Sequence, residues 1–360
     1  MRKVCIQVDQ RLGERLRVML VERGLLDPEF PITKEANKLC FPLRHQLTSD
    51  ELHALKQETM PLAQIELDLE PISRKPTDLK ATLQGTLPDG LLDKIPHSLD
   101  IIGEIAIVEL DTDLVSYEAH IGEAIMIINS RVSSVYAKEG GVSGVCRLRP
   151  LRLIAGRDQT YTIHTEYGVK IAIDVVHTYF SPRLGTEHDR VTRQVQAGEV
   201  IVDMFTGVGP FALLAAKRQS VQVFAIDMNP HAIQCLKKSL ELNRLVGEVV
   251  PLVGDTRAII DDQLAHKANR VIMNLPNDAF SFLDAAVTAL NPKGGIIHFY
   301  GVTCQSRPEE KLQSNVLHRL ADLGWKAIVA YSRSVRPAAP HEEQIVLDLH
   351  VTPGTTTSAT

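Results

Sequence analysis

The sequence predicts an α/β protein, in which a doubly wound sheet with a C-terminal antiparallel hairpin follows two smaller α+β domains. Residues 200–211, V-I-V-D-M-F-T-G-V-G-P-F, combine an apolar run that ends at an acid, a turn with two glycines and the start of an amphipathic segment. This order indicates strand, turn and helix. A second apolar run at 221–226 ends at Asp227, so the two runs form half of a βαβ unit. The runs at 326–331 and 344–351 have only a short loop between them, which predicts an antiparallel pair.

The same alternation fills the sheet domain, which we expect at residues 168–353. A strand at 169–174 and a helix that Thr186 caps and Glu187 begins precede the glycine-containing turn. Helices are then predicted at 230–243, 280–290 and 309–323, and strands at 249–253, 270–273 and 295–300. The loop of the terminal hairpin contains Pro337 and Pro340, and residues 354–360 form a polar tail that we expect to be disordered.

The first smaller domain is expected at residues 1–70 and contains a helix from the capping Asp9 through Arg23, with Gly24 as its stop. A strand at 38–43 and a second helix with a capping signal at 48–56 complete it. Residues 71–85 are predicted to be a linker, because residues 71–77 hold two prolines and two cations, although a helix is predicted from residue 79.

The second smaller domain is expected at residues 86–167. It combines a helix at 120–129 with β-rich segments at 101–110, 133–137, 144–153 and 160–167. Arg147 and Arg149 alternate within one of these segments, so we expect both side chains on one face of a single strand.

Composition limits the class of protein. Hydrophobic residues make up 44% of the 360 residues and aromatic residues only 5%, so aliphatic side chains must build most of the core. The five cysteines are scattered without a C-x-x-C pair, which argues against a disulfide framework or a zinc site and favours a reducing compartment. No metal-ligand spacing occurs among the 13 histidines. Without a long apolar run or a signal-peptide pattern, we expect a soluble cytoplasmic protein with no membrane partner.

The charge distribution is uneven, although the net charge is only −5. Residues 131–195 carry 10 Lys and Arg against 6 Asp and Glu, whereas residues 1–130 carry 14 against 22. A local basic face on an acidic protein is compatible with a specific folded RNA and not with indiscriminate phosphate binding.

The glycine-containing turn has the geometry of an adenosine cofactor site. Gly207-x-Gly209-x-x-Ala212 formally satisfies the dinucleotide fingerprint, but Pro210 removes a helix-N-terminal amide and Asp203 adds a carboxylate beside the turn. A pyrophosphate is therefore disfavoured, and a cation such as the ammonium of a methionine moiety is favoured. The pattern D-x-F-x-G-x-G-x-F, which includes Phe205, resembles the first motif of class I S-adenosylmethionine-dependent methyltransferases, which have a Rossmann-like sheet with a terminal hairpin. A ligand-free turn and a nicotinamide site are the alternatives.

Polar residues follow four successive strands of the predicted sheet. Because ligands of open α/β sheets lie outside the carboxyl ends of the strands, these residues are expected around one crevice. Asp203 would lie near the methionine part of the cofactor, Asp227 at the ribose hydroxyls and Asp255 near the adenine amino group, where each could instead be a helix cap. The fourth is Asn274, in Asn274-Leu-Pro276, which provides an amide oxygen and a main-chain carbonyl that can hold a planar N–H-bearing group, as in the N-P-P-Y motif of base and amide methylases. A simple strand-to-loop turn is the alternative.

Four motifs together resemble the archaeal and eukaryotic tRNA (guanine-N1)-methyltransferases, which act on position 37 beside the anticodon. They are G-V-C-R-L-R-P around Arg147, Y-F-S-P-R-L-x-x-E from Tyr179 to Glu187, the glycine-containing turn, and N-L-P-N-D-A-F-x-F-L from Asn274. The likeness covers nearly the whole chain and is most specific over residues 144–300. It includes the N-terminal domain, which in that family senses the outer corner of the tRNA.

The resemblance implies specific roles for residues of this chain. Glu187 would be the general base that removes the N1 proton of guanine, and Arg147 would stabilise the negative charge on O6. Tyr179 would position the base, while Asn274 with Pro276 would hold its edge. The cofactor residues would be Asp203, Phe205, Gly207, Gly209, Asp227, Asp255 and Asn274. Arg149, Arg183, Arg190 and His188, expected at the surface beside Glu187, would contact the tRNA.

The resemblance therefore predicts a monomeric, RNA-binding enzyme of tRNA modification. It would use S-adenosylmethionine, bind tRNA bearing G37 and hold no metal. It requires the second domain to close over the catalytic crevice. One rival is a wyosine-pathway enzyme at the same nucleotide, either an aminocarboxypropyl transferase or a methylase of the tricyclic precursor. The other is a non-catalytic RNA-binding protein that keeps a methyltransferase fold.

Overall fold

The computed structural model describes residues 1–58, 61–71, 78–96, 98–141, 144, 146–304, 309–339 and 341–354. The chain divides into two compact units, Met1–Lys75 and Pro76–Thr360, which are described separately. The core of the predicted linker, residues 72–77, and most of the predicted tail, residues 355–360, lie outside the described residues. No helix of the described part is long and apolar enough to cross a bilayer.

The first unit is a small antiparallel sheet with two helices. The strand order is β2-β3-β1-β4, and Ile6, Leu16, Leu20 and Phe41 lie in the core between sheet and helices. The capping signal before the second helix is confirmed, since Thr48 and Glu51 exchange backbone and side-chain hydrogen bonds. The elements are β1 (Arg2–Asp9), η1 (Gln10–Leu12), α1 (Gly13–Glu22), β2 (Thr33–Glu35), β3 (Lys38–Pro42), α2 (Ser49–Glu58) and β4 (Leu62–Asp68).

The second unit begins with a four-stranded sheet of order β5-β6-β7-β8, covered by helices. The predicted run 101–110 splits into the hairpin β5–β6 because Gly103, at φ 57°, makes the turn between Ile102 and Ile105. Helix α5 connects the parallel strands β6 and β7. The elements are α3 (Leu79–Leu83), α4 (Asp89–Leu92), β5 (Asp100–Ile102), β6 (Ile105–Val108), η2 (Thr112–Tyr117), α5 (Glu118–Ile128), β7 (Ser134–Lys138) and β8 (Leu151–Gly156).

A seven-stranded sheet dominates the rest of the unit, with the order β13-β12-β11-β14-β15-β17-β16. Its first five strands are parallel, and β17 runs antiparallel to both of its neighbours, which confirms the predicted terminal hairpin. The strand order reverses between β11 and β14, and a ligand crevice of an open α/β sheet lies at such a switch point. The strands are β11 (Val200–Asp203), β12 (Gln222–Asp227), β13 (Glu248–Val253), β14 (Arg270–Met273), β15 (Gly295–Cys304), β16 (Trp325–Ala339) and β17 (Glu342–Pro353).

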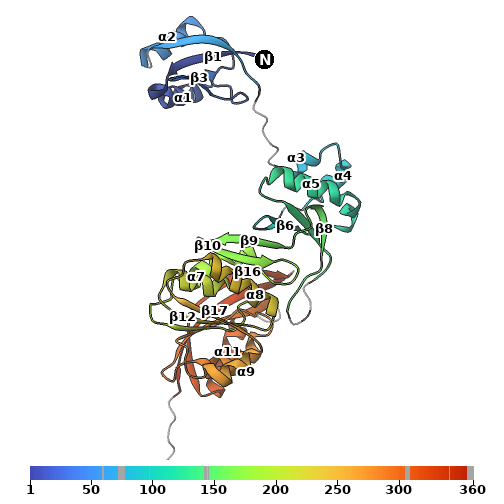
Figure 1. Ribbon diagram of the computed structural model, residues 1–360, viewed down its shortest axis with the longest axis vertical. Helices are drawn as coiled ribbons and strands as arrows, with labels where there is room; N and C mark the ends of the chain where they lie inside the picture. The colour runs from blue at the N-terminus through green and yellow to red at the C-terminus, as the bar shows by residue number, and fades with distance from the viewer. Residues whose placement is uncertain are drawn as a thin grey trace, which may run out of the picture. The chain divides into compact units, whose positions relative to one another are not determined.

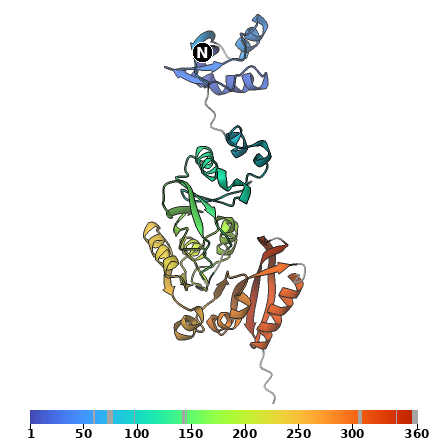
Figure 2. The same cartoon turned by 90° about the vertical axis from the view of Figure 1, so that its right-hand side faces the viewer.

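Helices cover both faces of this sheet. Figure 1 shows α7 and α8 on one side and α9 and α11 on the other, and Figure 2 shows α11 alongside the terminal hairpin, drawn in red. Neighbouring residues such as Ile201 and Val202 contribute to different cores, because strand side chains alternate between faces. The helices are η3 (Pro182–Leu184), α6 (Gly185–Thr192), α7 (Pro210–Arg218), α8 (Pro230–Leu242), α9 (Thr256–Ile259), η4 (Ile260–Leu264), η5 (Ala279–Phe282), α10 (Leu283–Ala289) and α11 (Glu309–Asp322).

Several expected boundaries were wrong. Within the predicted linker, α3 places Leu79 and Leu83 in the core beneath α5, because their spacing buries both on one helical face. The predicted domain limit at 167/168 cuts the turn of the hairpin β9 (Tyr161–Glu166) and β10 (Val169–Asp174), which packs as one body against α8. Pro337, expected in a loop, lies in β16 beside register shifts, where a missing N–H is tolerated. Pro340 lies outside the described residues.

Candidate active site

The turn between β11 and α7 ties the carboxyl ends of β11 and β12 together. Gly207 has φ 56°, and its N–H donates to Oδ2 of Asp227 at 2.7 Å. Gly209, at φ 82°, is the N-cap of α7, and a Cβ atom there would clash with Leu236 of α8. The backbone conformation therefore favours glycine at both positions, and close packing favours it in addition at Gly209.

Asp203 is a buried carboxylate with one unused oxygen. Its side chain is fully enclosed, Oδ2 accepts from the Thr206 hydroxyl at 2.7 Å, and Oδ1 has no partner in the described part of the chain. Burial raises the pKa of Asp203 to about 7; the Thr206 hydrogen bond opposes this rise, and nearby Asp227 adds to it. A cation at Oδ1 would remove this desolvation cost, so the site fits an ammonium group and disfavours a phosphate.

The other predicted cofactor acids also carry structural contacts. Asp227 accepts from the backbone N–H of Asn229 and Gly207, and burial raises its pKa against these two hydrogen bonds. Asp255 caps α9, because its Oδ1 accepts from the backbone N–H groups of Arg257 and Ala258. The capping alternative is thus realised for Asp255, and its contact with adenine stays a prediction.

Phe205 packs edge-on against the ring of Phe282, with 5.0 Å between the centroids. The contact joins the glycine-containing turn to the segment after Asn274. It places an aromatic ring two residues after Asp203, which ends β11.

A cationic cleft lies between the four-stranded sheet and the seven-stranded sheet. Its lining includes five cations and two acids, Asp100 and Glu109. Arg183 donates to Asp100 at 2.7 Å across the two parts. Such a surface suits an RNA backbone. The cations are Lys138, Arg147, Arg149, Arg183 and Arg336.

Arg147 lies in this cleft, but the predicted strand around it was wrong. Strand β8 begins only at Leu151, after Pro150, which has no N–H for a sheet ladder. Arg147 instead lies in a turn at φ 53°, and its N–H donates to the carbonyl of Gly144. The turn aims its guanidinium over the ring of Tyr179, 5.5 Å from the centroid.

Two residues of the terminal hairpin connect Tyr179 to Asn274. Arg336 donates to the Tyr179 hydroxyl at 2.8 Å, to the Ser181 hydroxyl at 3.0 Å and to Oε1 of Gln344 at 3.0 Å. Gln344 donates in turn to Oδ1 of Asn274 at 3.3 Å. Arg147, Tyr179 and Asn274 therefore belong to one contiguous set of side chains. The main-chain carbonyl of Tyr179 lies 3.5 Å from where a Cβ atom of Gly207 would be, so this set adjoins the glycine-containing turn.

The turn after Asn274 contains Pro276. The carbonyl of Leu275 accepts from the N–H groups of Asp278 and Ala279, so the strand-to-loop turn that we gave as the alternative is present. Oδ1 of Asn274 also accepts from Gln344, and the roles of Asn274 and Pro276 toward a substrate stay predictions.

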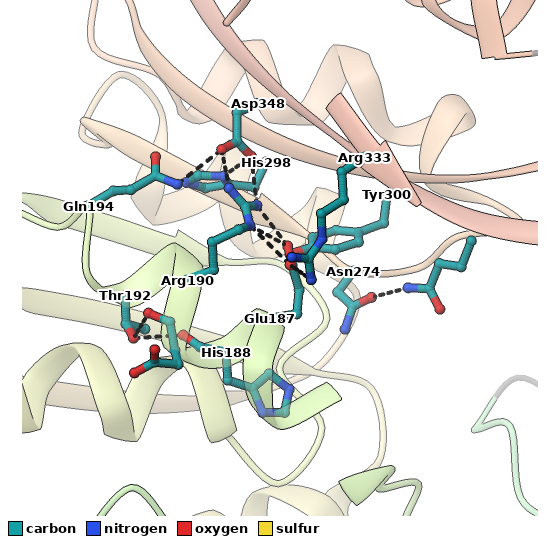
Figure 3. A network of polar contacts seen from close by, with 12 residues as sticks. Glu187, His188, Arg190, Thr192, Gln194, Asn274, His298, Tyr300, Arg333 and Asp348 are labelled. Atoms are coloured by element: carbon teal, nitrogen blue, oxygen red, sulfur yellow. Dashed lines mark hydrogen bonds and ion pairs between the residues drawn. The ribbon is translucent and has the colours of Figure 1, made fainter. Parts of the chain in front are cut away.

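Glu187 lies in the first turn of α6 and is fully buried. The helix begins two residues earlier than expected, at Gly185 with Leu184 and not Thr186 as its N-cap, because η3 leads directly into it. Oε1 of Glu187 accepts from Arg190 and from the Tyr300 hydroxyl, both at 2.7 Å. Oε2 accepts from Arg190 at 3.0 Å and lies 3.5 Å from Arg333. Figure 3 shows this carboxylate among its donors.

Two residues expected to contact tRNA have protein partners instead, and of these His188 is buried and Arg190 half-buried. His188 is only 2% exposed, pairs with Glu166 at 2.7 Å and packs edge-on against Phe211, so its expected surface position was wrong. Arg190 donates to the carboxylates of both Glu187 and Asp348. These charge-assisted hydrogen bonds are stronger than hydrogen bonds to neutral groups and occupy its guanidinium. We do not retain either as an RNA contact.

Sequence reasoning missed the residues that enclose Glu187 and those that connect to Asn274. They are Tyr300, Arg333, Arg336, Gln344 and Asp348. One signal was available: Gln344 and Asp348 interrupt the apolar strand Q-I-V-L-D-L-H-V, and a polar residue inside a buried strand needs a partner.

Known protein families match three parts of this chain. The tRNA methyltransferase 5 N-terminal domain matches residues 5–51, the TYW2 N-terminal domain matches 79–160, and the TRM5/TYW2 methyltransferase domain matches 162–326. The chain is 38% identical to the tRNA (guanine(37)-N(1))-methyltransferase Trm5b of Pyrococcus abyssi, over 97% of this chain and 99% of that protein. The chain belongs to the TRM5/TYW2 methyltransferase family. The resemblance and the fold class predicted from the sequence are thereby confirmed.

Further members of the family show its range. The tRNA 4-demethylwyosine(37)-methyltransferase Taw21 of Saccharolobus solfataricus is 31% identical over 70% of this chain and 92% of its own. Among solved structures, the complex of aTrm5 with tRNALeu has a TM-score of 0.76 at 31% identity, covering 96% of this chain and 99% of that one. Methanocaldococcus jannaschii Trm5 in complex with adenosine has a TM-score of 0.62 at 30% identity, covering 97% and 99%.

Proposed function

We propose that this protein is a tRNA (guanine37-N1)-methyltransferase that transfers the methyl group of S-adenosylmethionine to N1 of guanosine 37. The observation that carries the proposal is the contiguous set of Arg147, Tyr179, Arg336, Gln344 and Asn274 beside the glycine-containing turn. It combines a cation, an aromatic ring and amide groups at the carboxyl end of the sheet, which are the groups that bind a purine.

The residues around the glycine-containing turn fit the cofactor. Asp203 has a buried oxygen without a partner among the described residues for the ammonium group, and Asp227 lies at the tip of β12 for the ribose hydroxyls. Phe205, Gly207, Gly209, Asp255 and Asn274 complete the site. When bound, S-adenosylmethionine supplies an electrophilic methyl group.

The chain's own residues account for the proton. Guanine N1 carries a proton at neutral pH, so it becomes nucleophilic only when a base removes that proton and charge develops on O6. Glu187 is the base and Arg147 stabilises O6, while Asn274 with Pro276 holds the edge of the purine. Tyr179 positions the guanine. Arg147 lies over the Tyr179 ring, and Arg336 donates to the Tyr179 hydroxyl.

Glu187 must exchange one of its protein donors for the N1–H of guanine, because it is fully enclosed. Arg333 is the donor to be displaced. Its contact with Oε2 is long, at 3.5 Å, its side chain is 38% exposed, and its Nε is buried without a hydrogen bond among the described residues. Oε2 therefore takes the proton.

The tRNA enters the cationic cleft. Arg149 contacts its backbone, and Arg183 does so after leaving Asp100. The N-terminal domain contacts the outer corner of the tRNA. We infer that the protein is cytoplasmic and monomeric. Sedimentation of the purified protein tests the monomeric state.

A Glu187→Gln variant tests the assignment of the base. We expect it to bind S-adenosylmethionine and tRNA like the wild type, while methyl transfer to a transcript with G37 falls at least about a hundredfold. A transcript with A37 is the substrate control, and Glu241→Gln, at an exposed pair on α8, is the protein control. Full activity of Glu187→Gln would remove Glu187 from the mechanism. If the wild-type protein does not bind S-adenosylmethionine in calorimetry, the non-catalytic alternative is favoured.

The similarity to Taw21 favours a second activity, methylation of a wyosine precursor at the same nucleotide. Mass spectrometry of nucleosides from tRNA carrying that precursor tests it, because added methyl and aminocarboxypropyl groups differ in mass. An unmodified precursor would restrict the enzyme to guanosine.

A further inference from the structure

A chain of ionisable side chains, joined by hydrogen bonds and ion pairs, runs from Glu187 into the interior of the sheet domain. Arg190 joins Glu187 to Asp348, His298 joins Asp348 to Arg270, and Arg270 pairs with Glu199. Figure 3 shows Arg190 reaching toward both Asp348 and Glu187. Three strands and α6 contribute to this chain, so it is part of the tertiary structure and not of one motif.

Asp348 is the centre of this chain. It lies in β17, is 4% exposed, and accepts from Gln194 at 3.0 Å and from both terminal nitrogens of Arg190 at 2.5 and 3.0 Å. Burial alone would raise its pKa, but the hydrogen bonds from His298, Arg190 and Gln194 hold the pKa of Asp348 well below its usual range. Asp348 is therefore ionised at neutral pH.

His298 is neutral and its tautomer follows from its neighbours. Its Nε2 lies 2.7 Å from Arg270, and because a guanidinium only donates, this nitrogen must accept. The proton is then on Nδ1, which donates to Asp348 at 2.6 Å. Burial lowers the pKa of His298, outweighing the attraction of Asp348, and Arg270 and Arg190 add to the lowering. Arg190 thus lies between two carboxyl groups, those of Glu187 and Asp348.

We propose that Asp348 is a positioning residue for the base Glu187 and acts through Arg190, by drawing part of the guanidinium away from Glu187. This inference rests on the proposed role of Glu187. Arg190 gives Nη1 to Asp348, Nε to Glu187 and Nη2 to both, at 2.7 Å to Glu187 and 3.0 Å to Asp348. The two carboxylates therefore compete for one cation.

The competition controls how readily Glu187 accepts a proton. Charge-assisted hydrogen bonds favour the ionised carboxylate, so a guanidinium that belonged to Glu187 alone would make it a weaker base. The other charged or titratable groups that face Glu187 or Arg190 are Tyr300 and His298 from β15 and Arg333 and Tyr331 from β16. Burial and Glu187 raise the pKa of Tyr300, so its phenol stays protonated. Asp348 is thus the negative charge that balances Arg190 against Glu187.

The test is the pH dependence of methyl transfer in single turnovers with enzyme in excess, from about pH 3.5 to about pH 9, because carboxyl groups ordinarily titrate near about pH 4 and the acidic limb must lie inside the range. In Asp348→Asn, Arg190 binds Glu187 alone, so we expect the rate plateau to fall about tenfold and the acidic limb to move to lower pH. In Arg190→Gln, Glu187 loses its cation and the acidic limb moves to higher pH. Adding Asp348→Asn to Arg190→Gln should change nothing further, because the residue acts through Arg190.

Asp189→Asn is the matched control. Asp189 also lies on α6 and pairs with two arginines, Arg193 and Arg218, but does not contact Glu187. We expect its acidic limb to equal that of the wild type. If Asp348→Asn does not fold, Gln194→Met replaces it: Asp348 then loses a neutral donor, holds Arg190 more tightly and moves the limb to higher pH.

The proposal is overturned if folded Asp348→Asn or Gln194→Met keeps the acidic limb of the wild type. It is also overturned if Asp348→Asn lowers the rate by the same factor in the wild type and in Arg190→Gln. Glu187→Gln measured in parallel separates the two levels. If Glu187→Gln is inactive while Asp348→Asn behaves like the wild type, only the role of Asp348 fails. If Glu187→Gln is fully active, the proposed base fails and the role of Asp348 fails with it.

Discussion

Cofactor affinity should depend on pH through Asp203. In the free protein burial raises the pKa of this carboxyl to about 7, and its Oδ1 has no partner among the described residues. An ammonium group at Oδ1 needs the ionised form, so protonation of Asp203 competes with binding. The dissociation constant should then increase by a factor of about 1 + 10^(7−pH), which makes binding about eightfold weaker at about pH 6 than at about pH 7.5.

The sign for stability is the reverse of the usual carboxyl case. The folded pKa of Asp203 lies above its ordinary value of 3.8, so the native state holds this proton more tightly than the unfolded state. Its contribution to the stability of the free protein is complete below about pH 4 and is lost as the pH rises through about 7. A bound ammonium offsets that loss. The ligand-induced rise in Tm should therefore be larger at about pH 7.5 than at about pH 6.

Calorimetric titration with S-adenosylhomocysteine checks this prediction, over a range in which the ligand's α-amino group stays mostly charged. 5′-Methylthioadenosine lacks the amino acid and is the control ligand, for which we expect no such pH dependence. Asp203→Asn should weaken binding of S-adenosylhomocysteine and flatten its pH profile. Equal pH profiles for the two ligands on the wild-type protein would refute the assignment of Asp203 to the ammonium group.

Two further predictions concern the scaffold of the site. Gly209→Ala should lower the free energy of unfolding in urea by about 2–5 kcal/mol, because φ is 82° and the new methyl group meets Leu236. Gly198→Ala has a similar φ of 85° with open space around it and should cost only about 1–2 kcal/mol; equal losses would contradict the packing argument. Arg336→Lys keeps the charge but not the planar fork that spans Tyr179, Ser181 and Gln344, so methyl transfer should fall about tenfold at unchanged cofactor affinity. A wild-type rate in that variant would show that Arg336 does not align Tyr179 with Asn274.

The parts of the site that lie within one strand–turn–helix segment were predictable from the sequence. Asp203, Gly207 and Gly209 are near neighbours in the chain, and Asp227 ends the next strand, so local pattern and strand order suffice to bring them together. The terminal hairpin was predictable for a similar reason, because a short loop permits only antiparallel pairing. Arg147 was identified by motif, although its supporting backbone is a turn and not a strand.

The tertiary structure alone decided what surrounds Glu187. Tyr300, Arg333 and Asp348 reach this residue or its partner Arg190 from strands more than a hundred residues further along the chain, and no local periodicity encodes which of their side chains meet. The burial of His188 and the ion pairs of Arg190 were equally invisible, since α6 is polar in sequence but contacts β9, α7 and the hairpin. Local sequence determines which strands and turns form. Long-range packing decides which charges lose water, and that loss raises the pKa of Asp203.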